Sequence, residues 1–139
     1  MIEQEILQAL QTAAIAARDA STMPQLPIKA AGRTFVPPDD DKYLELIRIP
    51  NNITGEFWGD EKTYRGLFRI ILHWKLDDQG AYPAIVTLQS IVSFFTKSKS
   101  FAAGNVSVKI LDEPDYLGEI EASPSNMYPV SIRYQCFKP

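Results

Sequence analysis

The residue types that most often carry catalysis are scarce in this chain. Its 139 residues include one histidine, His73, and one cysteine, Cys136. Nucleophilic catalysis needs a general base beside the nucleophile, and that base is usually a histidine. His73 lies within an apolar segment, between Leu72 and Trp74. We therefore predict that His73 is a structural histidine with satisfied hydrogen bonds and that Cys136 is a small core residue.

Metal and phosphate sites are not indicated either. One histidine and one cysteine cannot form the common zinc sites. Asp39, Asp40 and Asp41 could recruit a divalent cation, but they lack the spaced ligands and the glycine of a calcium loop, so a solvated acidic turn is expected. Gly55 and Gly59 are not followed by the lysine and hydroxyl residue of a phosphate loop. From the sequence we expect no catalytic residue, no cofactor and no metal site, and we expect that the protein is not an enzyme.

Two helices are predicted from apolar residues at three- and four-residue spacing. The first covers residues 2–18, with glutamates in its first turn and Arg18 in its last, which suits the helix dipole. The second is expected to begin at Pro83, because proline suits the first helical position, and to end near Phe95. Between the first helix and the first strand, residues 20–41 contain four prolines and are expected to be irregular. That segment could lie across the core or over a neighbouring subunit.

Strands are predicted where apolar and polar residues alternate. They cover residues 43–49, 64–76, 106–111 and 130–136, and a shorter strand is allowed near 116–121. Hairpin-linked strands with helices gathered on one side define an α+β fold. We expect one domain over residues 1–139, with a mostly antiparallel sheet of four to five strands and two helices packed on one face.

The side of this sheet away from the helices is expected to be mixed in character. Acidic residues fall mainly in turns, so this face is mildly basic although the chain has a net charge of -3. It could be a solvated sheet face, or a contact surface for another subunit or a channel, and its apolar members favour contact because they need covering. Its predicted members are Leu67, Arg69, Ile71, His73, Lys75, Lys109, Leu111 and Arg133.

Two large aromatic residues, Phe57 and Trp58, fall in a loop predicted over residues 51–63. Large aromatics in a loop either fold back onto the core or act as contact anchors. Both interpretations are open from the sequence.

Composition limits the class of protein. Lys and Arg total 14 against 17 Asp and Glu, so the basic excess of a nucleic-acid reader is missing. No apolar run approaches the roughly 20 residues that span a bilayer, and the acidic N-terminal helix does not resemble a signal peptide. A soluble, intracellular protein without membrane contact is expected.

The chain resembles the phage tail terminator-like proteins, which are related in role to the minor tail protein U of long-tailed phages. The matching pieces follow one another over about residues 1–137. They are the N-terminal helix, then FVPPDDDKYLELIRIP, YRGLFRIILHW, a Gly80 turn into a helix ending near Phe94 and Phe95, VSVKI, Pro114 and MYPVSIRYQCF. The turn LDDQGAYPA departs from the family pattern because it is more acidic and contains a proline.

The resemblance implies a ring of about six copies that caps the head-proximal end of a tail tube. Such a ring stops tube polymerisation and offers a surface to the head connector. Its partners would be further copies of itself, the tail tube protein and the head completion protein, and DNA would pass through its lumen without being read. The protein would belong to the virion tail and assemble in the host cytoplasm. The residues predicted for subunit or partner contacts are Phe57, Trp58, Arg65, Arg69, Ile71, His73 and Arg133.

Two other functions remain open from the sequence. One is a phage neck or connector protein with the same assembly logic. The other is a small ligand-binding or isomerase-like domain, with Trp74 and Phe95 lining a pocket. Its polar group would be Tyr43, Tyr134 or His73.

Overall fold

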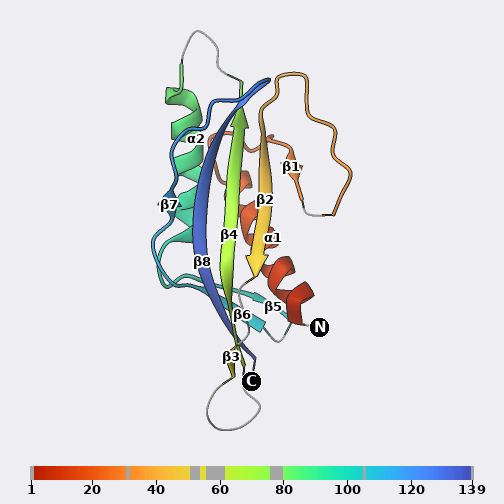
Figure 1. The fold of residues 1–139 in the computed structure, drawn as a ribbon, viewed down its shortest axis with the longest axis vertical. Coiled ribbons are helices and arrows are strands. Elements are labelled where there is room, and N and C mark those ends of the chain that lie inside the picture. The colour runs from red at the N-terminus through yellow and green to blue at the C-terminus, as the bar shows by residue number, and fades with distance from the viewer. Residues whose placement is uncertain are drawn as a thin grey trace.

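A single curved β-sheet runs through the computed structural model, and two helices lie on one of its faces (Figure 1). The structure describes residues 2–30, 32–50, 54–55, 62–75, 80–104 and 106–138. The elements are α1 (Ile2–Asp19), β1 (Ile28–Lys29), β2 (Tyr43–Pro50), β3 (Thr54–Gly55), β4 (Lys62–Trp74), α2 (Tyr82–Val92), the 3-10 helix η1 (Ser93–Phe95), β5 (Ser100–Ala103), β6 (Val106–Ile110), β7 (Asp115–Tyr116) and β8 (Asn126–Lys138).

The α+β fold class and the placement of both helices on one face are confirmed, but the sheet is larger than predicted. Within the described residues it has eight strands, ordered β1-β2-β4-β8-β6-β5, with β3 paired to β4 and β7 paired to β8. The pairing is antiparallel except between β1 and β2, which are parallel. The four to five strands expected from alternation omitted the shortest ones, which contain too few residues to show a period.

The central strands β4 and β8 are the longest elements of the sheet and pair along their whole length, from Lys62 with Lys138 to Trp74 with Asn126. Strand β8 begins earlier than the predicted residue 130 and contains Pro129. A proline cannot donate to a ladder. Pro129 fits because only its carbonyl is used on that edge, where it accepts the backbone N–H of Leu117 at 3.0 Å.

The core lies between the helices and the inner face of the sheet. The predicted inward set of β4, which includes Phe68, Ile70, Leu72 and Trp74, is buried. In α1, Ile6, Leu10, Ala13 and Ala17 of the predicted stripe are buried. In α2, Ala84, Leu88 and Ile91 are buried, and Phe95 follows in η1, while Ile85 and Val92 are half-buried. Both helices therefore pack as their periodicity predicted.

Gly66 lets β4 pass close to its neighbours. A Cβ at this position would lie 2.5 Å from the backbone oxygen of Ile49 and 2.6 Å from the Tyr134 hydroxyl. Tyr134, the partner of Gly66 in the ladder, occupies that space. Its hydroxyl accepts a hydrogen bond from Arg48 at 3.0 Å, and Arg48 also pairs with Glu3. This chain of contacts ties the start of α1 to the sheet.

Candidate assembly surface

The face of the sheet turned away from the helices is formed by β2, β4 and β8. In Figure 1 these strands lie in front of α1 and α2. The odd-numbered residues of β4 point to this side because successive strand residues alternate, and their register partners in β2 and β8 share it. We call this the outer face. Its positions include Glu45, Ile47 and Ile49 of β2. They also include the odd-numbered residues from Arg65 to His73 of β4 and from Met127 to Gln135 of β8.

Three arginines run along the outer face. Arg65 donates to the side chain of Gln135 at 3.0 Å, and Arg69 donates to the Ser131 hydroxyl at 3.2 Å. Arg133 lies opposite Leu67 in the ladder, between these two positions. Since Gln135 and Ser131 are neutral, neither contact neutralises the positive charge of its arginine. The sequence prediction that Arg69 and Arg133 share one face agrees with this register, which also places Arg65 there.

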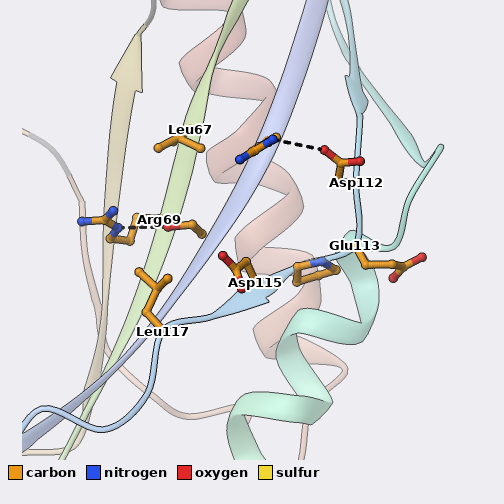
Figure 2. A pocket seen from close by; sticks show the side chains of 9 residues that line it. Leu67, Arg69, Asp112, Glu113, Asp115 and Leu117 are labelled. Atoms are coloured by element: carbon orange, nitrogen blue, oxygen red, sulfur yellow. Dashed lines mark hydrogen bonds and ion pairs between the residues drawn. The ribbon is translucent and has the colours of Figure 1, made fainter.

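Beside this row lies a trough of about 650 Å³ (Figure 2). One wall comes from β4 and the other from the chain that returns past β8 before and within β7. Arg133 faces Asp112 across 3.7 Å, and both side chains are more than half exposed. Figure 2 shows Leu67, Arg69 and Leu117 on one side and the acidic side chains on the other. Those acidic side chains are Asp112, Glu113 and Asp115.

His73 lies at the far end of the same face and is held firmly. Its Nε2 is 2.8 Å from Oε1 of Glu45, whose other oxygen is 3.6 Å from Lys29. Its ring stacks on Tyr43 with 4.3 Å between centroids and 9° between planes. His73 is 8% exposed. The prediction of a satisfied structural histidine is confirmed, and within the outer face His73 acts as a support for its neighbours.

The cysteine lies away from His73, because Cys136 pairs with Tyr64 while His73 pairs with Met127. Cys136 is buried in the core, as predicted, and burial raises the pKa of its thiol, which disfavours the reactive thiolate. Within the described ranges, no three His, Cys, Asp or Glu side chains come close enough to hold a metal ion. Neither described helix is long and apolar enough to cross a membrane.

The two residues predicted to line a pocket in the ligand-binding alternative are packed against other side chains. Trp74 and Phe95, its predicted lining, are both core residues. Phe95 packs against Phe68 with 6.0 Å between ring centroids and against Phe101 with 5.4 Å. Lys42 lies over the Trp74 ring, 4.4 Å from its centroid. These rings form part of the core of the described structure.

Of the seven predicted contact residues, five lie together on the outer face: Arg65, Arg69, Ile71, His73 and Arg133. Phe57 and Trp58 lie outside the described residues. Sequence reasoning missed Leu117 and the acidic wall as parts of the same surface, because that wall comes from a segment folded beside β8. It also missed Glu45 as the partner of His73, although the alternation in YLELIRIP places Glu45 on the polar side of its strand.

Comparison with known proteins identifies the family. The model of the phage tail terminator protein family matches residues 5–134. No curated protein matches the chain. Ten chains of solved structures match it. One of these, which carries no functional description, superposes with a TM-score of 0.82 at 23% identity, over 100% of this chain and 99% of that chain. That likeness shows a shared fold, and fold alone does not define function.

The family match covers nearly the whole chain, from the first turn of α1 to the last third of β8. It confirms the resemblance seen in the sequence. Tail terminators are structural proteins, which agrees with a surface built from ion pairs and apolar groups. The chain belongs to the phage tail terminator protein family and is a structural component of a phage tail.

Proposed function

We propose that this protein forms a closed ring on the head-proximal end of the tail tube, where it stops tube polymerisation and presents a surface to the head connector. The ring would contain about six copies, joined by contacts between different patches of successive subunits. DNA passes through the lumen without sequence-specific contacts. The tube protein and the head completion protein are the other proposed partners, and assembly takes place in the host cytoplasm.

The observation that carries this proposal is the outer face itself. In the described structure both helices cover the inner face, and the outer face of the three central strands is left without a helical layer. It combines apolar side chains with arginines that have neutral or exposed partners. Exposed apolar groups in such a setting favour contact with another protein. We assign Arg65, Arg69, Ile71 and Arg133 to subunit contacts, with His73 supporting the face from the side.

Phe57 and Trp58 are proposed as a second contact, with a neighbouring subunit or with the tube. Large aromatic residues are the commonest anchors of protein interfaces. Replacing Trp58 with alanine is then expected to weaken assembly while leaving the melting temperature of the subunit close to that of the wild type. Sedimentation and thermal melting measure these two quantities separately. A variant that melts much earlier but still assembles when folded would identify Trp58 as a core residue.

Tail length tests the capping role. Phage particles assembled without this protein are expected to carry tails of irregular and excessive length, because nothing stops tube growth, and to fail to join heads. Electron microscopy of a deletion phage, with a complemented strain as control, measures both features. Tails of normal length that lack heads would point instead to a neck or connector role.

A further inference from the structure

An exposed arm is the most conspicuous feature that the single subunit leaves unexplained. We define the arm as residues 32–41, between β1 and β2, where it projects beyond the β2 side of the sheet (Figure 1). Its residue Val36 is 81% exposed, more than any other large apolar side chain described. Burial of an apolar side chain is favourable because it removes apolar surface from water, so the subunit alone forgoes that stabilisation.

The arm is nevertheless well defined where it joins the sheet. Phe35 packs on Tyr43 with 4.9 Å between ring centroids. At its other end, the backbone N–H of Asp41 donates to the carbonyl of Pro38 at 3.0 Å, and the backbone N–H of Lys42 donates to the Asp40 carboxylate at 3.2 Å. Prolines at 37 and 38 restrict the backbone between these points. An arm that is already ordered loses little conformational entropy when it docks.

The exposed side chains of the arm occur in the order basic, apolar, acidic. Arg33 is exposed near its start, Val36 at its middle and Asp39 near its end. None of the three forms an ion pair within the described part of the chain, where five ion pairs involve other residues. The arm therefore offers three different contacts to a partner.

The trough offers the matching contacts. Its acidic wall, with Asp112 and Asp115, suits a basic side chain, and Leu117 on the other side is 47% exposed and suits an apolar one. The arginines Arg69 and Arg133 suit a carboxylate. The trough therefore offers a complement to each of the three exposed side chains of the arm.

The two surfaces occupy different parts of the sheet. The arm lies beside β1 and β2, whereas the trough is built by β4, β8 and the segment leading into β7 (Figures 1 and 2). Residues Pro37 and Asp41 of the arm border a separate cavity with His73 and Met127 near the start of β8, whereas Arg133 lies in the middle of that strand. A contact between arm and trough is therefore heterologous, and repetition of it closes a ring or extends a chain.

We infer that the arm of one copy docks in the trough of the next copy, with Val36 beside Leu117 and Asp39 near Arg69 and Arg133. This inference rests on the proposed ring and names the contact that joins its subunits. The partner is a second copy of this chain.

The experiment uses two variants that each remove one side of the contact. Val36→Asp with Asp39→Lys changes the arm, and Leu117→Asp with Arg133→Glu changes the trough. A control, Tyr82→Asp with Glu121→Lys, makes comparable changes at exposed positions elsewhere. All four proteins, wild type included, are compared by light scattering after size exclusion, and circular dichroism with thermal melting checks their folding.

The wild type and the control are expected to form the same closed oligomer, and each contact variant alone is expected to be a monomer. An equimolar mixture of the two contact variants is expected to give a dimer and nothing larger. The reason is that one protein retains its trough, the other retains its arm, and one contact per pair remains. This outcome is specific to a heterologous contact.

Three results would overturn the inference. The first is a contact variant that keeps the wild-type mass, and the second is a mixture that stays monomeric while the wild type assembles. The third is a wild type that is monomeric at every concentration. If a variant fails to fold, Val36→Cys with Leu117→Cys replaces it. Mild oxidation is then expected to produce a ladder of linked copies, and a lack of linked copies would overturn the inference. Tail length in the deletion phage tests the capping function independently of this contact. If the contact is wrong but the tails are irregular, the proposed function still holds. If the tails are normal, that function is rejected even if arm and trough bind.

Discussion

At the scale of single residues, Gly66 shows how the absence of a side chain allows the path of β4. Substituting alanine would place its Cβ 2.5 Å from the oxygen of Ile49 and 2.6 Å from the Tyr134 hydroxyl. The Gly66→Ala variant is expected to lose about 1–3 kcal/mol of unfolding free energy, the usual cost of overpacking. Lys109→Ala, at an exposed strand position, is the control in urea unfolding. Equal stability of Gly66→Ala and wild type would mean that Tyr134 moves aside freely.

Tyr128 predicts a pH dependence of stability. Burial, reinforced by a hydrogen bond from its hydroxyl to Glu119 at 3.1 Å, raises the pKa of Tyr128 from 10.0 to about 12. Between these values the unfolded chain has released the phenolic proton and the folded chain has kept it. Stability is therefore fully present below pH about 10 and falls as the pH rises towards 12.

A Tyr128→Phe variant is expected to lose stability less steeply across that window, because it has no phenolic proton to retain. Denaturant unfolding at pH values from about 9.5 to about 12, spaced by about half a pH unit, measures how the free energy of unfolding changes with pH. Tyr82→Phe, from an exposed position, serves as the control. Parallel curves for Tyr128→Phe and wild type would show that Tyr128 does not contribute to the alkaline loss.

At the scale of elements, α1 is expected to be stabilised by its buried stripe. Leu10 is fully buried in this helix, while Ile15 is 43% exposed on its other side. Leu10→Ala is expected to cost about 2–5 kcal/mol, since it leaves a cavity, and Ile15→Ala to cost less than about 1 kcal/mol. Chemical unfolding of both variants measures the difference. Similar costs would contradict the assigned packing face.

The elements also show what local sequence could predict. Long segments with a clear period, such as β4 and α1, were found within one to two residues of their observed ends. β1 and β7, of two residues each, are held by backbone pairing with β2 and β8 and have no pattern of their own. Ser100–Ala103 contains small residues with weak strand preference and forms β5 because β6 pairs with it.

The candidate surface was predictable to the same extent. Alternation assigned Leu67, Arg69 and Ile71 to one face, because a strand period needs only local sequence. The trough required knowledge of a distant segment, since Asp112 and Leu117 reach the arginines only after the chain turns back along β8. Periodicity carries no information about such tertiary neighbours.

At the scale of the whole molecule, the sheet separates two tasks. Its inner face and the two helices form the core that stabilises the subunit, and its outer face carries charged and apolar groups that the subunit does not pair fully. The proposed ring would use both, because each subunit must fold before it joins a neighbour. We propose that the outer face and the arm complete their contacts only in the assembled ring.

The mass of the purified protein in solution tests this claim most directly. Light scattering after size exclusion, over a range of concentrations and with and without magnesium, is expected to give one closed oligomer of about six copies. A closed species keeps its mass as concentration rises, whereas an open chain would grow. A protein that remains monomeric throughout, alone and with isolated tail tubes, would contradict the account.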